Sequence, residues 1–240
     1  MKDEKIKYKL KLASTYVSEG KNLHAIQIYQ RLINLTDSDE IYYLLTELYE
    51  SMGFTDSAIG LLEQLHSKFP ENINISLYYG QFLLRNSKWY EAIQILDNIK
   101  QNNSFVLYLI AYSYLMINEF EISKDYFTDY IKSNDNDELK LKAHLYLAII
   151  EYELKNYDKA LDFVNKAQFV YSDFWELNLI SAKIYYSLKM YNHALTSIEK
   201  ALRTNANDVS VQEYAGKIFY ALEDFEKSEM HFSKAIELSS

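Results

Sequence analysis

The stretch Ala182–Ala201, AKIYYSLKMYNHALTSIEKA, contains a pattern that recurs along the chain. Its small first residue is followed three places later by a large one, Tyr185, and twelve places later by a second small one, Ala194. Ala194, Ile198 and the final alanine are spaced by four and three residues, which places their side chains on one face of an α-helix. The stretch therefore predicts two helices joined by a short turn.

The second-helix pattern of a small residue followed by apolar residues four and seven places later occurs seven times. The seven instances are Ala25/Tyr29/Leu32, Ala58/Leu62/Leu65, Ala92/Leu96/Ile99, Ser123/Phe127/Tyr130, Ala160/Val164/Ala167, Ala194/Ile198/Ala201 and Ser228/Phe232/Ala235. Their starts are separated by 33, 34, 31, 37, 34 and 34 residues. The small residues twelve places upstream are Ala13, Thr46, Gly80, Ala111, Ala148, Ala182 and Gly216. A period of this length is typical of helical repeats.

The small residues have a physical reason. Two antiparallel helices approach closely only where the side chains at their crossing are small. A large residue three places after the first small one fills the space beside the crossing; Glu151 is the exception, and it predicts a helix that is rotated or slipped by one residue. A single helix pair cannot bury its apolar faces alone, so we expect the pairs to stack. We place the repeats at about 6–39, 39–72, 73–103, 104–137, 141–174, 175–208 and 209–240.

Composition supports an all-α protein. The chain has 5 Gly and 1 Pro, too few for the many turns of a β-sandwich. Cysteine is absent, which excludes disulfides and thiolate metal sites. The formal charge of −9 argues against nucleic acid or an anionic membrane as the main partner.

With its small–large–small pattern, the chain resembles the tetratricopeptide-repeat family over nearly its whole length. Ala13, Tyr16 and Ala25 match that pattern, and so do Gly216 and Phe219 together with Ser228. The resemblance implies a right-handed α-solenoid, a superhelix of antiparallel helix pairs forming one domain over 1–240. It also implies that the first helix of each pair lines a concave face that holds proteins or peptides.

The stripe opposite the buried one should face this groove. In the second repeat it is acidic, with Glu40, Tyr43, Glu47 and Glu50. From the third repeat onward it becomes aromatic and then basic. The residues we expect to bind a partner are Arg85, Phe105, Tyr108, Tyr112, Lys142, Tyr152, Lys183, Tyr186, Lys217 and Tyr220. Tyrosine offers a large apolar area and a hydroxyl, and the lysines would meet acidic groups of a partner segment.

A structural role competes with this interpretation for three of the tyrosines. Tyr152, Tyr186 and Tyr220 share one repeat position, where the resemblance implies packing between neighbouring first helices. For those three the structural role is favoured, whereas Phe105 and Tyr108 lie on one helix with Tyr112 and favour binding.

Signals for chemistry are missing from the sequence. The chain has no phosphate-binding glycine loop and no nucleophile or zinc motif, and its five histidines are scattered. We expect no enzymatic activity and no cofactor. There is no secretory signal or apolar run long enough to span a membrane, so a cytoplasmic protein is expected.

Two functions stay open. The first is a scaffold or adaptor that binds a protein segment in the groove. The second is a structural protein that associates with itself through the last repeat, where Met230, Ile236 and Leu238 would form an exposed apolar face without a polar cap.

Overall fold

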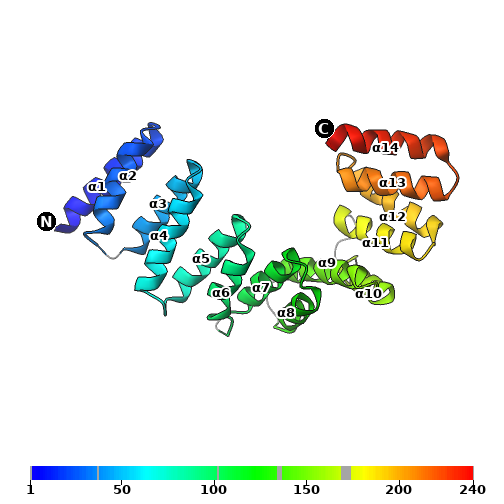
Figure 1. The fold of residues 1–240 in the computed structure, drawn as a ribbon, viewed down its shortest axis with the longest axis horizontal. Helices are drawn as coiled ribbons and strands as arrows, with labels where there is room; N and C mark the ends of the chain where they lie inside the picture. The colour runs from blue at the N-terminus through cyan, green and yellow to red at the C-terminus, as the bar shows by residue number, and fades with distance from the viewer. Residues whose placement is uncertain (1, 37, 102, 134–136, 169–173, 240) are drawn as a thin grey trace. The chain divides into compact units, whose positions relative to one another are not determined.

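The computed structural model describes residues 2–36, 38–101, 103–133, 137–168 and 174–239. Within these ranges the regular elements are fourteen α-helices, without a β-strand (Figure 1). They are α1 (Lys2–Ser18), α2 (Asn22–Ile33), α3 (Asp39–Ser51), α4 (Thr55–Lys68), α5 (Ile73–Arg85), α6 (Trp89–Asp97), α7 (Ser104–Met116), α8 (Phe120–Lys132), α9 (Asp137–Glu153), α10 (Tyr157–Gln168), α11 (Trp175–Ser187), α12 (Tyr191–Thr204), α13 (Val209–Ala221) and α14 (Phe225–Ser239).

The helices are arranged in pairs, and each pair corresponds to one predicted repeat. Within the pairs α1 contacts α2, α3 contacts α4, α5 contacts α6, α9 contacts α10, α11 contacts α12, and α13 contacts α14. The second helix of one pair also contacts the first helix of the next, as α2 does with α3 and α12 with α13. The predicted all-α solenoid of stacked helix pairs is confirmed.

The chain divides into two compact units, Met1–Ser113 and Tyr114–Ser240, with the boundary inside α7. Apolar side chains fill each unit along the line of contact between successive helices. In the first unit Leu32 and Ile33 of α2 share one cluster with Ile41 of α3. In the second unit Ala201 of α12 belongs to one cluster with Val211 of α13. Each unit is therefore held together by the same kind of contact between consecutive helices.

The small residues lie at the crossings where the helices approach most closely. A Cβ atom added to Gly80 would lie 2.5 Å from Cδ2 of Leu96, and one added to Gly216 would lie 2.8 Å from Cδ1 of Phe232. The hydroxyl of Ser228 donates a hydrogen bond to the carbonyl of Gly216 at 3.0 Å. The predicted reason for small residues at these positions is thus confirmed.

All seven pairs share one turn. The residue seven places after the first-helix small residue has a positive φ in every repeat. These residues are Gly20, Gly53, Ser87, Asn118, Lys155, Lys189 and Glu223. In each turn the N–H of that residue donates a hydrogen bond to the carbonyl three residues earlier, as Lys189 does to Tyr186. The N–H of the following residue donates to the carbonyl five residues earlier than itself, as Met190 does to Tyr185. This is the Schellman arrangement that ends a helix, and it occurs at the same position of every repeat.

Glu151 does not mark a slipped helix, so that expectation is wrong. The residue is only 3% exposed, and its carbonyl accepts the turn hydrogen bond from the N–H of Asn156, as the carbonyl of the large residue does in the other repeats. Nδ2 of Asn156 donates a hydrogen bond to its Oε2 at 2.7 Å, and Nζ of Lys124 lies 3.9 Å from its Oε1. The repeat tolerates a buried carboxylate because two polar groups surround it.

Exchanging the turn residues tests the shared turn. Lys189→Gly should raise the free energy of unfolding by about 1 kcal/mol, because glycine adopts a positive φ without a Cβ clash. Gly20→Ala should lower it by a similar amount, since an added Cβ would meet nothing within 4 Å and only the backbone strain counts. Urea unfolding followed by circular dichroism measures both changes. Two unchanged midpoints would contradict the shared turn.

The buried carboxylate can be tested in the same way. Glu151→Ala should lower the free energy of unfolding by about 3 kcal/mol, because it removes the acceptor of the Asn156 side chain and leaves a cavity. Glu153→Ala changes the same residue type at an exposed position of α9 and should have little effect. Equal losses in the two variants would show that the contacts of Glu151 contribute nothing special.

Candidate functional site

Four of the predicted binding residues meet in the second unit around a residue that the prediction did not include, Tyr214. Tyr152 lies on α9, Lys183 and Tyr186 lie on α11, and Lys217 lies with Tyr214 on α13. These three helices are the first helices of consecutive pairs, and α11 contacts both α9 and α13. We call these five residues the Tyr214 cluster.

The three tyrosines of the cluster connect the three helices. The hydroxyl oxygens of Tyr152 and Tyr214 lie 3.4 Å apart, and either hydroxyl could donate the hydrogen bond. The ring of Tyr186 meets the ring of Tyr214 edge to face, with centroids 6.3 Å apart. The Tyr152–Tyr214 contact joins α9 to α13 beside α11. In this cluster, tyrosines from three repeats therefore hold one another in position.

Two lysines lie against the ring of Tyr214. Nζ of Lys183 is 4.9 Å from the ring centroid and Nζ of Lys217 is 4.6 Å from it, both within the range of cation–π attraction. Lys217 also forms an ion pair with Glu213 at 2.5 Å. Lys183 makes no ion pair with any residue that the structure describes. Lys183 is half-buried as a residue, and its ammonium group could form an ion pair with a carboxylate from outside.

The electrostatics keep Tyr214 neutral. Burial is the main effect that raises the pKa of Tyr214, and the hydrogen bond with Tyr152 and the carboxylates of Glu213 and Glu153 raise it further. A neutral hydroxyl can both donate and accept a hydrogen bond. The cluster therefore presents aromatic surface and the neutral hydroxyl of Tyr214 beside two cations.

The tyrosines at the shared repeat position also have a structural role. Tyr152 packs against Tyr157, Tyr186 against Tyr191, and Tyr220 against Phe225, with centroids 5.8, 5.6 and 5.5 Å apart. Each partner is the first residue of the second helix in the same pair, so these contacts cover the turn. Among the ring contacts of the described residues, Tyr186 is the one of these three tyrosines that also meets a ring of a neighbouring first helix, in the way that the resemblance implied.

Two predicted residues of this unit are outside the cluster. Lys142 lies in an earlier part of α9, where its Nζ is 4.0 Å from Glu138. Tyr220 lies near the end of α13, exposed and in contact with Phe225. The structure therefore divides the six residues predicted for this unit into four that meet and two that do not.

In the first unit, the predicted charges neutralise one another. Nη2 of Arg85 on α5 lies 3.4 Å from Glu50 on α3, and Asn86 donates a hydrogen bond to the same carboxylate at 3.3 Å. Glu50 belongs to the predicted acidic strip, so part of that strip is compensated within the chain.

Two tyrosines lie near this ion pair. The rings of Tyr43 and Tyr78 lie 4.1 Å apart. Burial raises the pKa of Tyr43 to about 12, with Asp39 adding to the shift, so this phenol also stays neutral.

The aromatic residues of α7 are less exposed than the sequence predicts. Tyr108 is only 8% exposed and stacks on Phe105, with centroids 6.2 Å apart. Tyr112 is half-buried and meets the edge of Trp89, with centroids 5.9 Å apart. The expected exposed aromatic cluster is therefore reduced, because α7 is apolar on nearly every side and its sequence does not indicate which side is buried.

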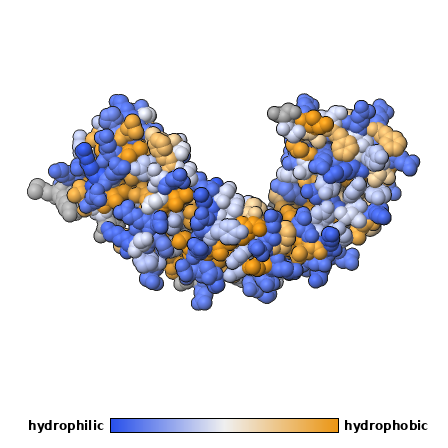
Figure 2. Space-filling view, viewed as in Figure 1, coloured by the Kyte–Doolittle hydropathy of each residue, from blue (hydrophilic) through white to orange (hydrophobic). Residues whose placement is uncertain are grey.

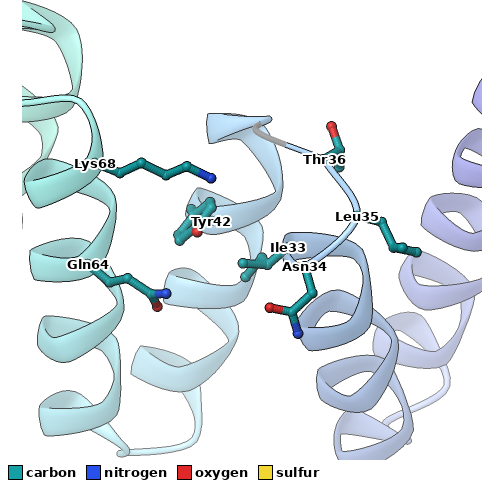
Figure 3. Close-up of a pocket in the computed structure, with 7 residues that line it drawn as sticks. All are labelled: Ile33, Asn34, Leu35, Thr36, Tyr42, Gln64 and Lys68. Carbon is teal, nitrogen blue, oxygen red and sulfur yellow. The ribbon is translucent and has the colours of Figure 1, made fainter.

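The first unit also has a cleft of about 620 Å³ between α2 and α4 (Figure 3). Gln64 and Lys68 extend into it from α4, and Asn34 follows the end of α2 on the opposite side (Figure 3). Tyr42 of α3 lies at its base. The lining is mixed in polarity and contains no pair of cations such as Lys183 and Lys217, so the Tyr214 cluster remains the stronger candidate site.

In the described part of the chain no group of three or more His, Asp or Glu side chains could hold a metal ion. None of the described helices combines the length and the apolar character needed to cross a bilayer.

Family models match much of the chain. Two models for tetratricopeptide repeats match residues 108–173 and 176–208. A model for subunit 3 of the anaphase-promoting complex, or cyclosome, matches residues 51–123. No curated protein matches the chain in sequence.

Solved structures show the same fold at low sequence identity. A tetratricopeptide repeat protein from Parabacteroides merdae is 17% identical, with a TM-score of 0.74 over 99% of this chain and 94% of that chain. MamA from Desulfovibrio magneticus is 16% identical, with a TM-score of 0.61 over 69% of this chain and 94% of that chain. YrrB, described as a TPR protein with an unusual peptide-binding site, is 14% identical, with a TM-score of 0.56 over 74% of this chain and 91% of that chain.

The helix pairs, their period and these matches agree. The chain is a tetratricopeptide-repeat protein of seven repeats.

Proposed function

We propose that this protein is a scaffold that binds a segment of a partner protein on the surface formed by α9, α11 and α13. The observation that carries the proposal is the Tyr214 cluster, in which two ammonium groups lie against one tyrosine ring beside the hydroxyl of Tyr152. Three consecutive first helices contribute to it, which is the arrangement that an elongated ligand would cross.

The chemistry of the cluster indicates what the partner segment should contain. Tyrosines bury a large area at low entropic cost and are enriched where proteins bind one another. Lys183 can pair with a carboxylate of the partner without losing an ion pair among the described residues. Lys217 would have to give up its ion pair with Glu213 or bind both carboxylates. The partner segment should therefore combine apolar side chains with Asp or Glu.

The comparisons support a protein-binding role at the level of the family. The solved structure of YrrB is described as having a peptide-binding site, which is a property of that protein. For the present chain, the choice of surface rests on its own tyrosines and lysines.

Selection from a displayed peptide library tests this proposal. Peptides selected on the whole protein should be enriched in acidic and aromatic residues. The double variant Lys183→Glu/Lys217→Glu should bind them at least about 50-fold more weakly, because two attractive contacts become repulsive and each charge-assisted contact contributes about 1 to 3 kcal/mol. Fluorescence polarisation with labelled peptides measures the loss.

The matched control is Lys159→Glu/Lys200→Glu, which makes the same change of net charge at exposed positions on α10 and α12. It should reduce affinity by no more than about threefold, because solvent and salt screen distant charges. Equal losses of affinity in the two double variants would show that the effect comes from net charge and not from this surface. Unchanged binding by the Lys183→Glu/Lys217→Glu variant would reject this surface.

A self-associating assembly protein is the second candidate. It is favoured by a separate observation, the exposed apolar residues on the outer faces of α1 and α14.

A further inference from the structure

One position of the first helices is exposed in only one repeat. It lies five residues before the small residue at the crossing. In six repeats it is apolar and at most 1% exposed, as Ile41, Ile75, Val106, Ala143, Leu177 and Val211. In α1 the same position is Tyr8, which is 69% exposed.

The reason is the contact between consecutive pairs. Ile41 of α3 packs in one cluster with Ile33 at the end of α2, and Val211 of α13 packs in one cluster with Leu202 near the end of α12. The second helix of the preceding pair therefore covers this position. In the described chain, α1 has no preceding pair to cover Tyr8.

The last helix shows the complementary half of this contact. Ile33 and Leu202 lie eight residues after the small residue of their helices. The equivalent position is also buried or half-buried in the second helices of the other repeats before the last one. In α14 it is Ile236, whose side chain is 68% exposed. Apolar surface is visible over α14 beside the C-terminal end (Figure 2).

We propose that the outer face of α14 in one copy of the protein binds the outer face of α1 in a second copy. The contact would repeat the packing of α12 on α13, with Ile236 of the first copy against Tyr8 and the half-buried Leu12 of the second copy. The interface continues the stacking rule by which the second helix of one pair contacts the first helix of the next, as α12 does with α13.

The charges of the two helices favour this pairing over a contact between like ends. Along α1 the described charges after Asp3 are mainly basic. They are Glu4, Lys5, Lys7, Lys9 and Lys11. On α14 and the turn before it the charges are mainly acidic, and these are Glu223, Asp224, Glu226, Lys227, Glu229, Lys234 and Glu237. Two copies of α1, or two copies of α14, would bring like charges together, whereas α1 on α14 brings opposite charges together.

This interface joins different faces of the two copies, so a pair leaves one α1 face and one α14 face open. Such contacts continue into longer assemblies instead of stopping at two. A contact between one helix pair is small, so a dissociation constant on the order of 100 μM is expected.

Sedimentation equilibrium of the full chain tests the proposal. The average mass should be near 28.3 kDa for one chain in dilute solution. It should exceed twice that value at about 1 mM, ten times the dissociation constant expected for so small an interface. Tyr8→Asp and Ile236→Asp should each remain single chains. Mixed in equal amounts they should form pairs and nothing larger, because each variant retains the face that the other lacks.

Met230→Asp is the matched control. Met230 is an exposed apolar residue of α14 at a repeat position that is exposed in all seven repeats, so it lies outside the proposed interface. This variant should associate like the wild type, and circular dichroism should show that all variants fold. A single-chain mass at every concentration would overturn the proposal. So would self-association of Tyr8→Asp alone, or the absence of pairs in the mixture.

Discussion

The close approach of two helices at a pair of small residues is the constraint on which the rest of this structure depends. At Gly80 and Gly216 an additional carbon atom would collide with the facing helix. The Schellman turn then returns the chain in the same direction in every repeat, with a positive φ even at Lys155, Lys189 and Glu223. Because crossing and turn have the same geometry each time, successive pairs stack through equivalent side chains.

The candidate site follows from this regularity. The first helices α9, α11 and α13 lie next to one another, so tyrosines and lysines one or two repeats apart in sequence meet in space. Tyr152 and Tyr214 are 62 residues apart in the chain, yet their hydroxyls touch. Stacked repeats in this way bring side chains that are far apart in the sequence together on one surface.

The repeat and its crossings could be predicted from sequence because they depend on local spacing. Offsets of four and seven residues identify a helix face whatever its partner is. The position of Tyr214 could not be predicted in this way. It lies two residues before the small residue, outside the stripe assigned to the groove, and its contact with Tyr152 depends on how closely successive pairs approach.

The burial of Tyr108 could not be predicted either, since α7 is apolar on nearly every side and its periodicity indicates no single buried face. Glu151 departs from the large apolar residue type of the repeat in sequence. In the structure it is still buried, because Asn156 and Lys124 interact with its carboxylate.

The most direct measurement is a map, by nuclear magnetic resonance, of the residues whose signals shift when an acidic, aromatic peptide binds. Binding at the proposed surface should shift the ring signals of Tyr152, Tyr186 and Tyr214 and the ammonium signals of the two adjacent lysines, while signals from the first unit stay in place. Shifts confined to the cleft between α2 and α4, around Asn34 and Gln64, would contradict the account.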